Sequence, residues 1–246
     1  MGNISSSCLF HFTNKFEYLK NILRDEFIPR YSLENLTIGK ADIEIAIPMI
    51  CFCDIPLSNI KHHIRKYGNY AIGMSLEWAE KNGINPVIYL KNNSILSKQL
   101  QKISTIIKPD SHTEITNPEA ILALTDILRY IKSFNGSFKR NWNSYENTDE
   151  KFYDEREWRY IPSIEDTKIE KAFISPVEFN KKANKALLSI KLNFIPDDIK
   201  YIIVSNENEI PKILETIKYV KSHRRPKEIE LLLSRILTVE QIKNDF

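Results

Sequence analysis

Acidic, basic and aromatic side chains crowd residues 154–160, where Glu155, Glu157 and Arg159 recur at every second position. In a β-strand, alternate side chains point to the same face, so this spacing predicts that the two carboxylates and the guanidinium share one face. Burying unpaired charges is costly, and a hydrophobic core therefore disfavours such a face. We predict that it lines a polar cleft, where carboxylates are suited to proton transfer and to stabilising positive charge.

A second interpretation of the same residues is structural. Glu155 and Glu157 can lie at an exposed strand edge and pair with Lys151, Arg156 or Arg159. Exposed pairs of this kind contribute only about 0 to 1 kcal/mol. The density of charged residues favours the functional interpretation, and so do the polar residues 134–151 before them, which we predict to be a mobile loop.

His11 and Thr13 lie two positions apart in residues 9–13, which we predict to be an opening strand, so they share a face. One interpretation is a histidine at the edge of the core whose ring nitrogens bond to the backbone. The other is a neutral imidazole and a hydroxyl that offer donors and acceptors to a polyol such as a ribose. The residues alone leave both interpretations open.

Residues 67–75 combine Tyr67 and Tyr70 with glycines that allow close backbone approach. The segment matches neither of the glycine-rich nucleotide-binding fingerprints. It is either a turn with packed tyrosines or a stacking wall for a planar ring.

Cys51, Cys53, His62 and His63 invite comparison with a zinc site, because thiolate and imidazole are preferred zinc ligands. Two cysteines separated by a single residue lack the usual spacing, and a free cysteine is most often a small buried hydrophobe. We therefore predict no metal site.

The composition is that of an ordinary globular protein, with 42% hydrophobic and 27% charged residues, and we predict one domain over residues 1–246. The net charge of +3, from 35 basic and 32 acidic residues, is too balanced to predict nucleic-acid binding by itself. The apolar runs are short and interrupted, so we expect no membrane span and no secretory signal. Three cysteines without such a signal predict a cytoplasmic protein.

Apolar spacing and turn residues predict an α+β fold. Residues 94–134 have helical spacing divided by Pro109 and Pro118, and we predict a helical insertion there. Residues 26–46 lack a clean period and are predicted to form an extended loop. The other predicted strands are 9–13, 48–53, 70–74, 86–90, 185–192 and 199–204, the other predicted helices are 16–25, 58–66, 75–83 and 207–221, and residues 228–237 fit either type.

Three segments resemble, in order, the His, Tyr and Glu motifs of ADP-ribosyltransferases, namely residues 9–13, 67–75 and 155–158. Residues 51–58, together with the tyrosine–glycine segment and the 155–160 run, are also similar to the AbiGi family of abortive phage-infection proteins. That second resemblance covers most of residues 8–162. The opening strand and helix further resemble the DarT class of DNA-modifying transferases.

The transferase resemblance implies a split β-sheet core around an NAD cleft. His11 and Thr13 would hold the adenosine-side ribose of NAD, and Tyr67 or Tyr70 would stack on the nicotinamide.

The same resemblance implies that Glu157 bonds the nicotinamide ribose, where its carboxylate would stabilise the positive charge that develops as nicotinamide leaves. Glu155 would orient or deprotonate the acceptor, which would be a nucleic acid or a protein.

The AbiGi resemblance implies phage defence. Members have been labelled antitoxins of a second abortive-infection protein, and such a role requires no NAD site. We therefore expect either a defence effector that is an NAD-dependent ADP-ribosyltransferase or a non-catalytic antitoxin that restrains a toxin partner.

Overall fold

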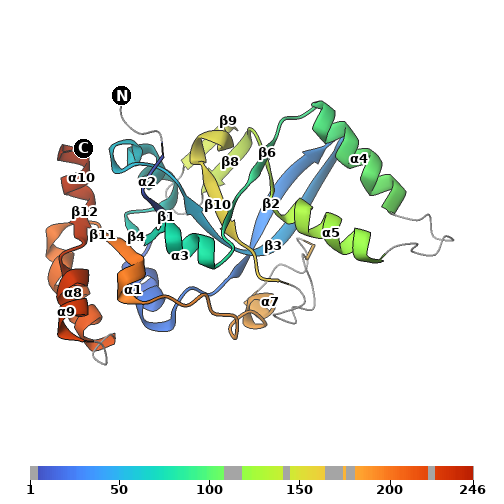
Figure 1. Cartoon of the computed structure of the whole chain (residues 1–246). Helices are drawn as coiled ribbons and strands as arrows, with labels where there is room; N and C mark the ends of the chain where they lie inside the picture. The colour runs from blue at the N-terminus through green and yellow to red at the C-terminus, as the bar shows by residue number, and fades with distance from the viewer. Residues whose placement is uncertain are drawn as a thin grey trace.

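A mixed sheet of eight strands runs through the computed structural model, which describes residues 5–107, 118–140, 145–163, 174–175, 181–220 and 225–245. The strand order is β12-β11-β4-β1-β3-β10-β5, and β2 is a further partner of β3 (Figure 1). These pairs are antiparallel except for β11 with β12. The strands are β1 (Cys8–Thr13), β2 (Arg30–Ile38), β3 (Ala41–Cys53), β4 (Tyr70–Ser75), β5 (Asn85–Pro86), β10 (Glu157–Tyr160), β11 (Ile199–Val204) and β12 (Ile236–Thr238).

Two short ladders accompany the main sheet. Strands β6 (Ile88–Leu90) and β7 (Ile131–Ser133) pair in parallel, whereas β8 (Gly136–Arg140) and β9 (Tyr145–Glu150) pair antiparallel. The predicted α+β class is confirmed. Within the described residues, the main sheet is not split as the transferase resemblance implies, because Phe10 of β1 pairs with both β3 and β4 and makes that sheet continuous.

Helices cover both faces of the main sheet. On the face that we call the α1 face lie α1 (Phe16–Asp25), α3 (Leu76–Lys81), α8 (Ile210–Val220) and α9 (Pro226–Leu233). On the opposite face, called the α2 face, lie α2 (Lys61–Tyr67) and α10 (Val239–Asp245). Helices α4 (Ile95–Ile107) and α5 (Pro118–Arg129) lie at the end of the molecule away from α8 and α9 (Figure 1).

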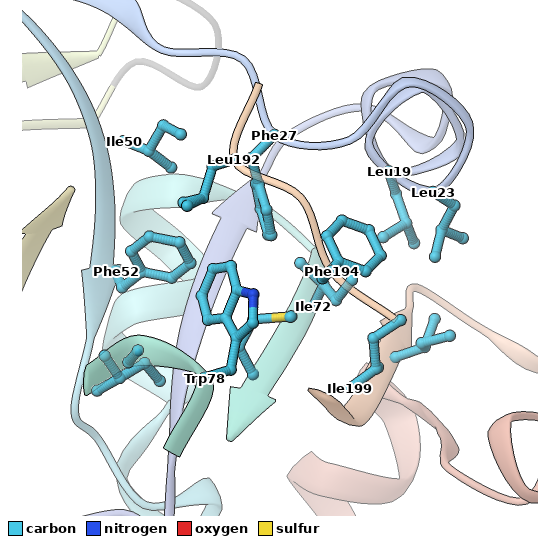
Figure 2. Close-up of a cluster of buried hydrophobic side chains, with 14 of the residues drawn as sticks. Leu19, Leu23, Phe27, Ile50, Phe52, Ile72, Trp78, Leu192, Phe194 and Ile199 are labelled. Carbon is cyan, nitrogen blue, oxygen red and sulfur yellow. The ribbon is translucent and has the colours of Figure 1, made fainter. Parts of the chain in front are cut away.

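The main hydrophobic core lies on the α1 face, where aromatic rings meet edge to face (Figure 2). The ring of Phe27 lies 5.4 Å from those of Phe52 and Phe194, and the ring of Phe52 lies 5.7 Å from that of Trp78. Such pairs add about 0.5–1.5 kcal/mol each beyond area burial. The core therefore ties the segment around Phe194 to strands from the first third of the chain.

The predicted loop over residues 26–46 is wrong. β2 and β3 form a long hairpin there, and Gly39 makes the turn with a φ of +64° that favours glycine. Pro48, taken as the start of a strand, lies within β3 opposite Tyr31. Leu36 and Ile38 on β2, and Ile43, Ile45 and Ile47 on β3, recur at every second position, which is a strand signal that the loop prediction does not use.

Three further predictions concern the connecting segments. The predicted mobile loop over residues 134–151 is wrong, because β8 and β9 occupy most of it. The predicted strand over residues 185–192 is also wrong, since α7 (Lys181–Lys185) is followed by turns, and Leu192 makes an isolated bridge with Phe27. The helices predicted within residues 94–134 are confirmed as α4 and α5, although that stretch ends in β7.

Candidate functional site

Glu157 and Arg159 are placed by β10, whose antiparallel pairing with β3 directs both side chains to the α2 face. Glu155 lies outside this strand, in the 3-10 turn η2 (Phe152–Glu155). Arg156 separates the turn from the strand and has a left-handed backbone with φ +46°. The prediction of one strand over residues 154–160 is therefore wrong, because the alternation of side chains begins only at Glu157.

Two lysines from other elements bring Glu155 and Glu157 into one cluster. The Nζ of Lys132, on β7, lies 3.1 Å from Glu155 Oε2 and 2.5 Å from Glu157 Oε2. The Nζ of Lys66, on α2, lies 2.6 Å from Glu155 Oε1. The Tyr67 hydroxyl donates to the same oxygen at 2.6 Å. Lys132 is thus the bridge between the two carboxylates.

Further ion pairs extend the cluster on both sides. Arg159 Nε donates to Glu157 Oε1 at 2.6 Å, and another guanidinium nitrogen of Arg159 donates to Glu34 Oε1 at 2.7 Å. Lys66 also contacts Glu150 Oε1 at 2.8 Å. We call this set the charge network, and it consists of Glu34, Lys66, Lys132, Glu150, Glu155, Glu157 and Arg159.

The charge network is buried except at Glu34, whose side chain is 13% exposed. Exposed fractions are 3% for Glu155, 6% for Glu157 and 0% for Arg159, so the predicted polar cleft is wrong for these side chains. The network places three cations against four carboxylates, and this pairing offsets the desolvation of each group. The charged side chains of residues 155–159 that were predicted to line a cleft therefore lie inside the protein, where they form ion pairs.

The pairing fixes the protonation states. Burial alone would raise the pKa of Glu157, but Arg159 and Lys132 outweigh it and lower the pKa to about 2. Burial likewise opposes the charge of Glu155, and Lys132 and Lys66 lower its pKa below the ordinary value. Burial would lower the pKa of Lys132, but Glu155 and Glu157 raise it well above its ordinary value. All three groups are therefore charged at neutral pH.

Every carboxylate oxygen of Glu155 and Glu157 has a partner within the network. Glu157 uses one oxygen for Arg159 and the other for Lys132. Glu155 uses one for Lys66 and Tyr67 and the other for Lys132. A carboxylate with a strongly lowered pKa is a poor general base at neutral pH. These buried ion pairs therefore join α2, β7, η2 and β10, and we call this arrangement an ionic clamp.

His11 and Thr13 lie on the other side of the sheet. His11 is in register with Ile72, which belongs to the core of the α1 face. Its ring packs against Phe27 and Phe52, and its Nδ1–H donates to the carbonyl of Cys51 at 2.8 Å. Burial lowers the pKa of His11, so the imidazole is neutral. The sheet thus separates His11 and Thr13 from Glu155 and Glu157.

The two candidate tyrosines are separated in the same way. Tyr67 joins the charge network through Glu155, and burial raises its pKa well above the ordinary value. Tyr70 packs against the core of the α1 face and donates its hydroxyl to Glu209 Oε1 at 2.8 Å. Burial and this bond raise the pKa of Tyr70 to about 12. Tyr67 therefore groups with the carboxylates, and Tyr70 with His11 and Thr13.

Sequence reasoning missed several members of the charge network. Lys132 falls at the end of the predicted helical insertion, and Glu150 falls in the predicted mobile loop. Glu34 falls in the predicted loop that is the β2–β3 hairpin. No local pattern singles out these residues, because their partners in the cited bonds lie 25, 84 and 125 positions away along the chain.

The cysteines and histidines considered for zinc do not converge. Cys53 is buried in the apolar cluster of the α2 face, and His63 stacks on Tyr67 with ring centroids 4.4 Å apart. Among the residues that the structure describes, no group of three or more metal-ligating side chains is arranged to hold an ion. In the same residues, we find no helix with the length and apolarity that crossing a membrane requires.

Comparisons with known proteins give one consistent family. Residues 25–205 match the family model described as "Putative abortive phage resistance protein AbiGi, antitoxin". The chain is also similar to the abortive phage resistance protein AbiGi of Lactococcus lactis subsp. cremoris, with 33% identity over 249 residues that span 89% of this chain and 99% of the relative. No solved structure matches significantly.

Proposed function

The chain belongs to the AbiGi family of abortive phage resistance proteins, and from this premise we propose that it is a non-catalytic antitoxin that restrains a toxin partner. The family description names an antitoxin. Such a protein requires a stable scaffold and a contact surface but no reactive cleft.

The observation that carries this proposal is the arrangement of the candidate NAD residues. Glu155 and Glu157 are committed to buried cations on the α2 face, whereas His11 and Thr13 lie on the α1 face. One NAD molecule held by both groups would have to pass through a continuous sheet. The charge network is better explained as an ionic clamp within the scaffold.

Growth of bacteria tests the antitoxin proposal. The chain expressed alone should leave growth unchanged, and the protein encoded by the neighbouring gene, expressed alone, should inhibit growth. Co-expression of the two should restore growth, whereas co-expression of that neighbour with an unrelated soluble protein should not. Inhibition of growth by this chain alone would contradict the proposal.

A second candidate function is the NAD-dependent ADP-ribosyltransferase, with a nucleic acid or a protein as acceptor. The observation that favours it is the grouping of Glu155, Glu157 and Tyr67 on one face. Use of Glu157 on a ribose would require Lys132 to release it. Purified protein incubated with labelled NAD and cell lysate distinguishes the two functions, and under the antitoxin proposal no label is transferred. Labelling that Glu157→Gln abolishes in a folded variant would favour the transferase.

A further inference from the structure

The β8–β9 hairpin is attached to the fold at two points that both adjoin the charge network. It begins shortly after β7, which carries Lys132, and it ends at Glu150, shortly before Glu155 of η2. In the described part of the chain, β8 and β9 pair with each other and not with the main sheet. Figure 1 shows the two strands at the upper rim of the molecule. The hairpin is thus a separate unit set beside buried charges.

Two side chains of the hairpin lie against α2. The ring of Phe138 lies 5.1 Å from the Nζ of Lys66, and its centroid lies 5.8 Å from that of Tyr67. Glu150 Oε1 contacts the same lysine at 2.8 Å. Lys66 and Glu150 have exposed fractions of 1% and 5%. The hairpin therefore keeps water away from the Lys66 end of the charge network.

The hairpin is held together by its own bonds. Its ladder runs from Gly136 to Arg140 on one strand, and the Ser137 hydroxyl donates to the carbonyl of Thr148 at 3.3 Å. Residues 146–149 are exposed. Segments that bury few apolar side chains open at a lower free energy than the core of a protein. The hairpin is therefore suited to move away from α2 as one body.

A clasp between Phe134 and Tyr153 fixes the base of the hairpin. The backbone N–H of Tyr153 donates to the carbonyl of Phe134 at 3.2 Å, and the two rings stack with centroids 5.4 Å apart. The N–H of Phe134 donates in turn to the carbonyl of Leu90 on β6 at 2.9 Å. Gly136 follows the clasp, and the strand register shifts between Gly136 and Phe138. Glycine readily absorbs a change of backbone angles, so this point can act as a hinge.

Opening at this hinge leaves every buried charge with a partner. Lys66 keeps Glu155 at 2.6 Å, and Glu155 also keeps Lys132 at 3.1 Å. Glu150 would pass into water, where a carboxylate carries no desolvation penalty. Loss of Lys132 from its place would instead leave Glu155 and Glu157 facing each other inside the protein, which is strongly unfavourable. The Lys66 end is therefore the end of the network that can open.

We infer that the β8–β9 hairpin is a hinged cover of the charge network, which opens about the Phe134–Tyr153 clasp and exposes Lys66 while the rest of the fold stays intact. Lys132 remains enclosed in the open form, because the ring of Phe152, 5.1 Å from its Nζ, belongs to η2 and not to the hairpin. The cover gives water access to one end of the ionic clamp without unfolding. This inference concerns the scaffold and does not depend on the antitoxin function.

Pulse labelling of the purified full-length chain with acetic anhydride, followed by mass spectrometry, tests the inference. Lys61 is exposed and serves as the reference for the reagent. Labelling of each lysine is compared with its rate in the unfolded chain. Labelling of Lys66 should depend only weakly on urea, because local opening exposes little surface, whereas labelling of Lys132 should rise steeply with urea, as global unfolding does. The same steep dependence for both lysines would overturn the inference.

Variants of the hairpin sharpen this measurement. Phe138→Ala removes the ring that covers Lys66 and should speed labelling of this lysine by about two- to tenfold, the range expected from loss of an aromatic contact. Labelling of Lys61 and Lys132 should stay unchanged. Glu150→Gln weakens the ion pair with Lys66 and should act in the same direction as Phe138→Ala. Unchanged labelling of Lys66 in both variants would contradict the cover.

Phe12 offers a matched control on the other side of α2. Its ring lies 5.0 Å from that of His63, and the side chain is half-buried. Phe12→Ala removes an aromatic contact from α2 without touching the hairpin, so it should leave the ratio of Lys66 to Lys132 labelling unchanged. A rise in this ratio equal to that of Phe138→Ala would show that α2 itself loosens, and it would overturn the inference.

Discussion

Lys132→Met is expected to lower the free energy of unfolding by about 3 to 5 kcal/mol, because removing one partner of a buried ionic group leaves the others uncompensated. Lys132 lies between Glu155 and Glu157 at 3.1 and 2.5 Å, and both carboxylates are buried. Without the lysine, two negative charges would face each other in the interior. Urea unfolding followed by circular dichroism measures the change.

Two variants give this measurement its controls. The double variant Lys132→Met with Glu157→Gln removes one positive and one negative charge together, and it should recover part of the lost stability. Lys151→Met breaks a pair with Asp154 whose side chains are 52% and 63% exposed, and it should change the free energy of unfolding by less than about 1 kcal/mol. Equal effects of Lys132→Met and Lys151→Met would show that the charge network is not an internal clamp.

Acid is expected to destabilise the protein through the same network. The pKa of Glu157 falls from an ordinary value of 4.5 to about 2 in the folded protein, chiefly because Arg159 and Lys132 outweigh the effect of burial. A lowered folded-state pKa contributes stability that is present above the unfolded value and is lost as the pH falls through the folded value. For Glu157 the loss therefore occurs between about pH 4.5 and pH 2 and amounts to about 3 kcal/mol.

Other groups change the size of this acid effect but not its sign. The pKa of Glu155 is also lowered, so it adds to the loss in acid, while Lys132 has a raised pKa and stays charged throughout. Unfolding in denaturant at a series of pH values measures the slope. Glu157→Gln should flatten the slope relative to the wild type even though the variant is less stable at neutral pH. An unchanged slope would mean that Glu157 is not paired in solution.

Local signals in the sequence predicted the elements whose pattern repeats within a few residues. The apolar spacing of Phe16 to Leu23 predicted α1, and the continuous apolar run before Asp54 predicted the end of β3. The β2–β3 hairpin was missed although Ile43, Ile45 and Ile47 alternate, because charged residues separate them and the partner strand is fixed only by pairing in the folded chain. The left-handed backbone of Arg156 was missed because nothing in the surrounding residue types requires it.

In the candidate site, too, neighbouring residues were grouped correctly from the sequence, whereas distant ones were not. The sequence indicated that Glu155 and Glu157 belong together, and the structure groups them through Lys132. The sequence also grouped His11 with them, but a sheet has two faces, and strand register decides to which face each residue points. Residues that match the His, Tyr and Glu motifs in the expected order along the chain can therefore lie on opposite sides of a sheet.

The α+β class, the AbiGi kinship and the unusual density of charge in residues 154–160 follow from the residue order alone. That this charge is internal and paired is visible only in the folded chain. The reason is that the free energy of a buried carboxylate depends on cations brought from distant parts of the chain, here Lys66 from α2 and Lys132 from β7. The spacing of side chains within residues 154–160 does not reveal these two lysines.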